Sequence, residues 1–198
     1  MVSFTAANGA SIQDKFCYIS REAAGSNNAV LVTGTNTTWQ NSYSAIVGFA
    51  GVEGSLTISN GASMSSTDHN ILGNDATSRN NRVLVTGGGS VLNSTLNLYL
   101  GWSAPANTLV ISNGAKVIDD YGSLGLFPSS VSNSAAVVGS GSIWTNSSNF
   151  YVGHSSVGNS LVISNGVKVY DNRGYIGWDG DGNNNYALCL DSMRMSGF

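Results

Sequence analysis

Short apolar patches recur along the whole chain, separated by turns rich in Gly, Asn and Ser. Within a patch, every second position is aliphatic: Leu56 and Ile58 flank Thr57, and the stretches around Ile111 and Ile163 have the same arrangement. This alternation is typical of β-strands, whose successive side chains point to opposite faces. No segment of 12 residues shows the apolar stripe of a helix. The pattern therefore predicts many short strands joined by tight turns.

The patches return at a fixed distance. Residues 109–117 read LVISNGAKV and residues 161–169 read LVISNGVKV, one substitution apart at a distance of 52 residues. Three landmarks share a period of 52 or 53 residues: an Asn-Gly dipeptide, a Val-Thr-Gly or Val-Val-Gly tripeptide, and an aliphatic residue followed by Gly. The dipeptides start at Asn8, Asn60, Asn113 and Asn165, the tripeptides end at Gly34, Gly87 and Gly139, and the aliphatic-Gly pairs end at Gly48, Gly101 and Gly153. Their agreement indicates an internal repeat.

Each repeat divides into two similar halves of 26 or 27 residues. The centres of the first apolar patch of each half are Ala6, Val32, Ile58, Val85, Ile111, Val137, Ile163 and Cys189. Each half holds three strand-like patches, which predicts a parallel β-helix (a solenoid) of about seven to eight coils of roughly 26 residues. We expect a right-handed coil, by analogy with parallel crossover connections. A β-propeller is the alternative, but the near-equal halves argue against it, since antiparallel blade strands would not share one short pattern.

Stacked coils place each residue beside its counterpart in the next coil, about 4.8 Å away. The residues expected inside are Leu56, Ile58, Leu109, Ile111, Leu161, Ile163, Val47, Leu100, Val152 and Ile176. Cys17 and Cys189 fall in the first and last coils, on the order of 30 Å apart by this stacking, which is beyond disulfide reach.

Composition narrows the possible partners. Only 10% of the residues are charged and the net charge is −3, which excludes a polybasic nucleic-acid binder. No run of 18 apolar residues occurs, so we expect no membrane span in this segment. The opening residues, MVSFTAANGASIQ, have neither the basic region nor the apolar region of a signal peptide.

The repeats resemble a known family of bacterial surface proteins. The stretches GSLTISNGASM, NTLVISNGAKV and GNSLVISNGVKV, followed by VTG…W…N…YVG, are similar to the repeats of autotransporter passengers and of PEP-CTERM-associated surface proteins. The family's Trp position is filled by Trp39 and Trp144, with Leu92 in the middle copy. The resemblance covers the chain from about Phe4 to Leu190.

This resemblance implies secretion and display at the outer membrane or in the extracellular space. It implies that residues 1–198 are a single solenoid segment of a longer passenger, with flanking coils of the same chain as its neighbours. The last residues, 186–198 (YALCLDSMRMSGF), depart from the repeat, which suggests an atypical or truncated last coil.

Two carboxylates are the first candidates for catalysis. Asp119 and Asp171 share one position two coils apart, and Lys116 and Lys168 precede them by three residues. In a β-helix that cleaves polysaccharides, such residues could form an acid–base stripe. We favour the alternative interpretation, in which these aspartates and lysines lie in solvated turns as complementary charges.

Other candidate sites are weaker. His69, beside Asp68, and His154 lie in different coils, so a Ser-His-Asp site has little support. The stretch WDGDGNNN at 178–185 fails the calcium-loop pattern, because the positions that need Gly and Glu hold Asn184 and Leu190. We interpret it as a turn, and we expect no catalytic residue, no cofactor and no metal.

The residues after the aliphatic-Gly pairs and their counterparts form a partly aromatic column: Arg21, Phe49, Asn74, Trp102, Leu126, His154 and Trp178. It holds Phe49, Trp102, His154 and Trp178, whose flat rings could stack on the sugars of an extended glycan. The alternative is that these rings cover a corner of the core. The sequence thus predicts a non-catalytic structural or adhesive segment that meets an extracellular glycan or a host cell surface. The alternative function is a glycan-active lyase or hydrolase.

Overall fold

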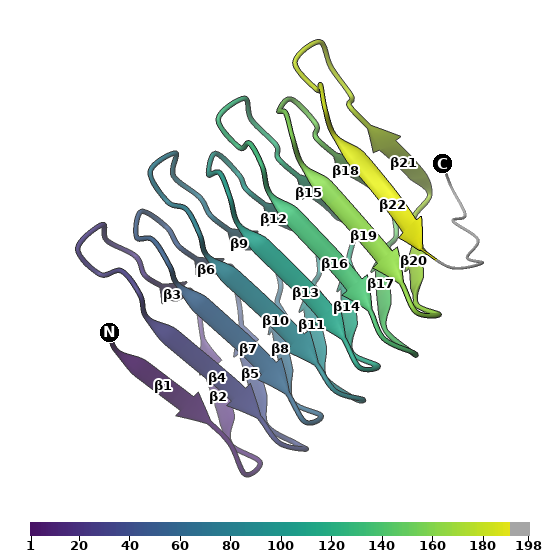
Figure 1. The fold of residues 1–198 in the computed structure, drawn as a ribbon. Coiled ribbons are helices and arrows are strands. Elements are labelled where there is room, and N and C mark those ends of the chain that lie inside the picture. The colour runs from purple at the N-terminus through teal and green to yellow at the C-terminus, as the bar shows by residue number, and fades with distance from the viewer. Residues whose placement is uncertain (191–198) are drawn as a thin grey trace.

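The protein is a stack of parallel coils, seen from the side in Figure 1. The structure, a computed structural model, describes residues 1–190. Each coil contributes one strand to each of three parallel sheets, and no helix occurs among the described residues. The first strand of the chain, β1, and the last described strand, β22, lie at opposite ends of the stack (Figure 1). The prediction of an all-β parallel β-helix is confirmed, with seven complete coils and the first strand of an eighth.

The three sheets run along the stack, and we name them A, B and C in the order in which the chain visits them. Sheet A consists of β1 (Ser3–Ala6), β4 (Ala29–Thr33), β7 (Ser55–Ser59), β10 (Arg82–Thr86), β13 (Thr108–Ser112), β16 (Ser134–Val138), β19 (Ser160–Ser164) and β22 (Tyr186–Leu190). Sheet B consists of β2 (Ser11–Asp14), β5 (Thr38–Asn41), β8 (Ser63–Ser66), β11 (Val91–Ser94), β14 (Lys116–Asp119), β17 (Ile143–Asn146) and β20 (Lys168–Tyr170). Sheet C consists of β3 (Cys17–Ile19), β6 (Ala45–Val47), β9 (Asn70–Leu72), β12 (Asn97–Leu100), β15 (Tyr121–Leu124), β18 (Asn149–Val152) and β21 (Arg173–Ile176).

The register of sheet A confirms the repeat that the sequence predicts. Ile58 pairs with Val32 on one side and with Val85 on the other, and Ile163 pairs with Cys189 in the last strand. All eight predicted centres lie in one unbroken column. Residues 186–190 therefore continue the stack as β22, whereas 191–198 lie outside the described residues.

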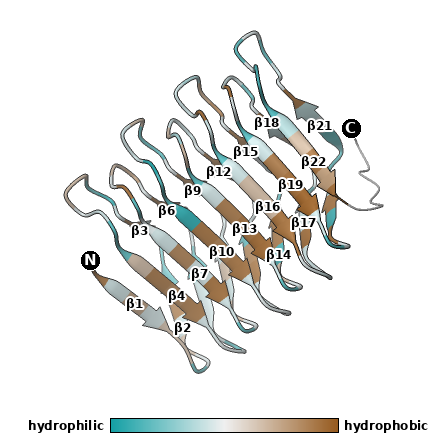
Figure 2. Ribbon diagram, viewed as in Figure 1, coloured by the Kyte–Doolittle hydropathy of each residue, from teal (hydrophilic) through white to brown (hydrophobic). Residues whose placement is uncertain are grey.

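Apolar side chains from all three sheets fill the interior, and Figure 2 shows the apolar stripe along the strands of sheet A. Nine of the ten predicted inward residues are buried. Ile176 is the exception, with 46% of its surface exposed. It occupies the inward column of Val152, but β21 is the terminal strand of sheet C and no described strand covers it.

A ladder of buried asparagines joins the loops that lead from sheet C to sheet A. Asn107 illustrates the repeat: its Oδ1 accepts from the backbone N and from Nδ2 of Asn81, both at 3.0 Å. Its own backbone N and Nδ2 donate to Oδ1 of Asn133 at 2.9 and 3.0 Å. The ladder runs through Asn81, Asn107, Asn133, Asn159 and Asn185, and its bonds satisfy backbone groups that these loops bury.

The ladder explains the aliphatic-Gly landmark. Each of these glycines has a positive φ, +81° at Gly101, and lies against a ladder amide. A Cβ atom at Gly101 would overlap the Asn133 side chain, so only glycine fits. The same contact joins the pairs Gly48–Asn81, Gly73–Asn107, Gly101–Asn133, Gly125–Asn159 and Gly153–Asn185.

The first coil reverses this pairing. Ser20 stands at the glycine position with φ of 55°, and Gly54 stands at the asparagine position opposite it. A Cβ atom at Gly54 would lie 2.9 Å from Oγ of Ser20. One member of each pair is therefore a glycine, because the two positions are too close for two side chains.

Neighbouring coils alternate between two versions, which produces the 52-residue period. Connections from sheet C to sheet A have seven residues in 48–54 and nine in 73–81, and this alternation continues along the stack. The turn from sheet A to sheet B also differs between neighbouring coils, because every second coil places a side-chain hydroxyl there. The hydroxyl of Ser90 accepts a hydrogen bond from the backbone N of Gly61 at 3.0 Å. Ser142 does the same for Gly114.

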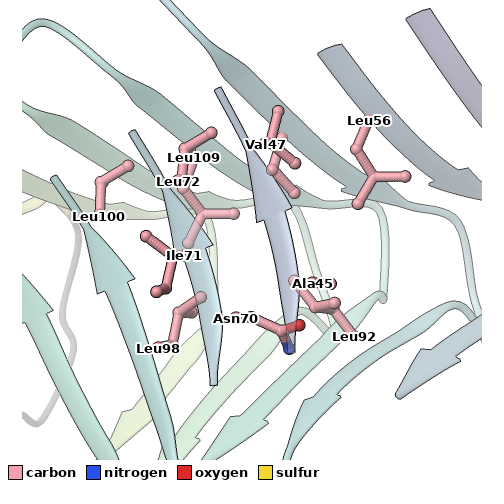
Figure 3. Close-up of a pocket in the computed structure, with 11 residues that line it drawn as sticks. Ala45, Val47, Leu56, Asn70, Ile71, Leu72, Leu92, Leu98, Leu100 and Leu109 are labelled. Atoms are coloured by element: carbon pink, nitrogen blue, oxygen red, sulfur yellow. The ribbon is translucent and has the colours of Figure 1, made fainter. Parts of the chain in front are cut away.

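A small apolar cavity lies in the core between β6, β9 and β12, and Figure 3 shows its lining. Leucines such as Leu56, Leu98 and Leu109 surround it. Asn70 is its polar residue, and the Nδ2 atom of Asn70 already donates to Asn93 and Ser94. The cavity therefore offers a ligand little beyond apolar contact.

Two further expectations concern cysteines and membranes. Cys17 in β3 and Cys189 in β22 are both free, as predicted from the stacking. Burial raises the pKa of the Cys17 thiol to about 12, with a further contribution from Asp14. In the described part of the chain, no helix is long and apolar enough to cross a membrane.

Candidate functional site: the aromatic face of sheet C

The outward side of sheet C carries most of the aromatic rings of the stack. Two rows make up this aromatic face: the outward residues of the strands and the residues that follow the column of glycines. The strand row holds Tyr18, Ile46, Ile71, Tyr99, Ser123, Tyr151 and Tyr175, and the second row holds Phe49, Asn74, Trp102, Leu126, His154 and Trp178. The aromatic column predicted from the sequence is the second row.

The second row packs onto the first. The Trp102 ring meets Tyr99 at a centroid distance of 4.7 Å with the planes at 88°, and Trp178 meets Tyr175 at 4.5 Å and 75°. Such edge-to-face contacts are favourable for aromatic pairs. They bury Tyr99, which is only 7% exposed although it points away from the main core. Ile46, Ile71 and Tyr99 thus form the centre of a second hydrophobic cluster.

Tyr121 extends the face at a place that the sequence analysis missed. The strand row is interrupted by Ser123, which lies between Tyr99 and Tyr151 in adjacent coils. The Tyr121 ring occupies the space above this small residue, 6.0 Å from the Tyr99 ring and 5.0 Å from the Tyr151 ring. The sequence did contain a signal for Tyr121: Ser123 is the one small residue in the strand row, which leaves room for a large side chain nearby.

Trp178 is the most open ring of the second row, at 50% exposure. It lies beside His154, at 6.4 Å between centroids, and Tyr151, at 5.5 Å. The other rings of this row, Phe49, Trp102 and His154, are partly buried. Most rings of the row therefore cover a hydrophobic corner, and Trp178 is exposed next to β21, the terminal strand of sheet C.

Polar groups adjoin the open ring. Oγ of Ser155 donates to Oδ2 of Asp179 at 2.6 Å and lies 2.8 Å from Nδ1 of His154. Since the hydroxyl proton goes to Asp179, Nδ1 of His154 is the donor to Ser155, and Nε2 of the neutral ring is left as an acceptor. The rim beside Trp178 therefore presents acceptors to a ligand.

The charges on this rim follow from its environment. Burial lowers the pKa of His154, and the Asp179 carboxylate partly offsets this effect. The hydrogen bond from Ser155 lowers the pKa of Asp179. At neutral pH the rim thus holds a neutral imidazole and a carboxylate.

The proposed acid–base stripe is not an open site. Asp119 pairs with Asn146 in the next coil, and Asp171 directly follows Tyr170, which pairs with Thr145. Asp119 faces the interior and is only 2% exposed, whereas Lys116 and Lys168 point outward. The interpretation of Asp119 as a solvated turn residue paired with lysine is therefore wrong. Its carboxyl is enclosed, so this stripe cannot act on a substrate as an acid–base pair.

The two histidines are not arranged as in a Ser-His-Asp site. Asp68 lies between its partners, with Oδ1 at 3.2 Å from Nε2 of His69 and Oδ2 accepting from Ser44 at 2.9 Å. Around His154 the serine is in the middle. A histidine base must instead bridge the nucleophile and the carboxylate.

The stretch 178–185 forms the connection between β21 and β22, as expected for a turn. The backbone N of Asp181 donates to Oδ1 of Asp179, and Asn185 belongs to the ladder. Among the described residues, no group of three or more His, Cys, Asp or Glu side chains could hold a metal ion.

Comparisons of the chain with models of protein families, with curated proteins and with solved structures found no match.

Proposed function

We propose that this chain is a non-catalytic segment of a bacterial surface protein, a stiff rod that binds an extracellular glycan through its aromatic face. The observation that carries the proposal is the continuous row of rings from Tyr99 to Trp178, which ends in a half-exposed indole beside acceptor groups. Tyr99 and Tyr151 are buried within this row, whereas the half-exposed Trp178 ring leaves an apolar surface that a partner could cover.

The chemistry of the face suits a sugar. The apolar side of a pyranose ring can lie on the Trp178 indole, while its hydroxyls donate to the Asp179 carboxylate and to Nε2 of His154. The Asn-, Ser- and Thr-rich turns and the resemblance of the repeats to passenger proteins support display outside the cell. Outer-membrane display and flanking coils of the same chain are parts of this proposal.

Binding is tested by titrating immobilised glycans with the purified chain. Trp178→Ala should weaken binding roughly 5–30-fold, since losing the buried apolar area of one ring costs about 1–2 kcal/mol. Tyr170→Ala is the matched control, because Tyr170 is 41% exposed in sheet B, away from the aromatic face. No binding by the unaltered chain, or equal losses in both variants, would refute the role of the aromatic face.

Display is tested separately, on the source cells. Antibodies raised against the rod should label intact cells. Labelling only after the cells are permeabilised would contradict display and leave glycan binding as a separate question.

A further inference from the structure

A column of polar side chains runs through the interior at the corner between sheets B and C. Its paired residues in sheet B are Asp14–Asn41, Asn41–Ser66, Ser66–Ser94 and Asp119–Asn146. Ser94 and Asp119 each lie one residue beyond the pair Asn93–Ile118, and Asn146 and Asp171 each lie one residue beyond the pair Thr145–Tyr170. Buried polar atoms are nearly always hydrogen-bonded, so an unpaired atom here requires an explanation.

The column contains two copies of one arrangement. Nε1 of Trp144 donates to Oδ2 of Asp119 at 2.7 Å, and the next residue in the column is Asn146. Four coils earlier, Nε1 of Trp39 donates to Oδ2 of Asp14 at 2.9 Å, and Asn41 follows. The Trp positions are those singled out in the sequence.

The intervening copy has changed in all three positions. Leu92 replaces the tryptophan, and Ser66 and Ser94 replace the carboxylate and the amide. There Ser66 donates to Asn70, and Asn70 donates to Ser94, so each of these side chains has a partner. Asp14 and Asp119 thus lie where an indole N–H is available, whereas neither carboxyl oxygen of Asp171, beyond β20, has a hydrogen-bond partner among the described residues.

The two copies that contain a tryptophan leave the same two oxygens unpaired. Oδ1 of Asp119 and Oδ1 of Asn146 are buried without a hydrogen-bond partner, and so are Oδ1 of Asp14 and Oδ1 of Asn41. Each pair belongs to residues directly opposite in neighbouring coils. An ionised carboxylate and an amide oxygen are both acceptors, so they cannot satisfy each other.

Rotating the amide does not remove the conflict. Nδ2 of Asn146 donates to the carbonyl oxygen of Tyr170 in the next coil at 3.4 Å. Exchanging the amide nitrogen and oxygen would place two acceptors together at Tyr170. A single proton on Asp119 instead turns one unpaired acceptor into a donor for the other.

We propose that Asp119 retains its proton at neutral pH and donates it to Oδ1 of Asn146, so that the rod contains a neutral carboxylic acid whose ionisation loosens the fold. Both carboxyl oxygens are then used, one by Trp144 and the other by Asn146. The inference is independent of the proposed function, because it concerns the interior of the stack.

The surroundings of Asp119 favour the neutral acid. Burial raises the pKa of this carboxyl well above its ordinary value, the hydrogen bond from Trp144 opposes the shift, and the Asp120 carboxylate adds to it. Ser94 in β11 and Asn146 in β17 flank it in the column, and Val117 and Trp144 pack nearby in the core. Among the described residues, Asp120 is the charged group that acts on it, and no cation offsets the burial.

The sign of the pH effect follows from linkage. The folded chain holds this proton more tightly than the unfolded chain, whose aspartates titrate near about 3.9. The stabilisation is therefore complete below that pH and is lost as the pH rises through the folded-state pKa. Between the two values, the unfolding equilibrium constant should rise about tenfold per pH unit for this one proton.

The test measures the protonation state and the pH dependence together. Carbon-13 NMR of the labelled chain should show the Asp119 carboxyl in its neutral form at pH 7, and an ionised carboxyl would overturn the proposal without any mutation. In denaturant unfolding at several pH values, Asp119→Asn should remove the tenfold slope, because its amide can accept from Trp144 and donate to Asn146.

The matched control is Asp181→Asn, which removes the same charge from an exposed loop and should leave the slope unchanged. A slope that is equal in the unaltered chain and in Asp119→Asn would also overturn the proposal.

Discussion

Single glycines determine how the chain turns from sheet C into the connecting loop. At Gly101, φ is +81° and the ladder amide of Asn133 occupies the space where a side chain would begin. Glycine is therefore required at this position for two reasons: the backbone has a positive φ, and there is no room for a Cβ atom. By contrast, Gly88 has no heavy atom within 4 Å of the place where its Cβ would lie, and its φ is not positive.

Gly101→Ala should therefore destabilise the rod, by about 1–3 kcal/mol for the backbone strain, with the overlap at Asn133 adding to it. Gly88→Ala adds the same methyl group in a turn where it fits, and it should change the free energy of unfolding by less than about 0.5 kcal/mol. Urea unfolding followed by circular dichroism measures both. Equal effects in the two variants would contradict the contact with the ladder.

The connecting loops act as elements in their own right, because the asparagine ladder links each loop to the next. The ladder is interrupted at Gly54, where Ser20 occupies the glycine position of the partner coil. Five pairs have glycine before asparagine and one pair has serine before glycine, so the two positions vary together. Their distance explains this: two side chains larger than hydrogen do not fit.

The ladder can be extended by a double substitution. Gly54→Asn alone should destabilise the protein, because the new Cβ would lie 2.9 Å from Oγ of Ser20. Adding Ser20→Gly recreates the pairing of the other coils, and the coupling energy between the two substitutions should be favourable by about 0.5–3 kcal/mol. A double-mutant cycle in urea measures it. If the two effects simply add, the contact between positions 20 and 54 does not prevent side chains at both positions.

The whole molecule is a stack of two-coil modules more than of single coils. Hydroxyls of Ser90 and Ser142 satisfy the turns of the preceding coils, and seven-residue connections lie beside nine-residue connections. In a solenoid, stability is approximately a sum of terms within repeats and between neighbours. Stability should therefore depend on keeping the two kinds of coil in alternation, so that each interface joins unlike coils.

Deleting residues 82–133 removes one module and joins Asn81 to Ser134, a junction equivalent to the native Asn133–Ser134. This shortened rod should fold cooperatively with the circular dichroism of a β protein. Deleting only 82–107 places two coils of one kind together and removes Ser90, so the backbone N of Gly61 loses its acceptor. We expect that variant to be less stable, by at least about 1–3 kcal/mol for the unpaired group. If the 82–107 deletion is the more stable of the two variants, the two-coil module is not the repeating unit of stability.

Much of the architecture could be predicted from the sequence because a solenoid repeats its contacts. A residue's neighbours are its counterparts 26 residues away, so the period, the column through Ile58 and Ile111 and the separation of the cysteines follow from counting. The candidate aromatic row was found in the same way. Its packing was not, because the cover of Trp102 depends on neighbours such as Tyr99 and Phe127, which lie in other parts of the sequence repeat.

The tertiary structure decided which way the polar residues face. The turn between sheets B and C varies from one to three residues, so the alternation of inward and outward positions cannot be carried across it by counting. Asp119 is the last residue of β14, directly before this turn, so the sequence alone did not show whether it belongs to the strand or to the turn. Ile176 has an inward position but is exposed because sheet C ends at β21. The repeat itself is determined by the sequence, since each coil carries the same short pattern. The burial of a particular carboxyl or ring depends on atoms from coils that the local pattern does not contain.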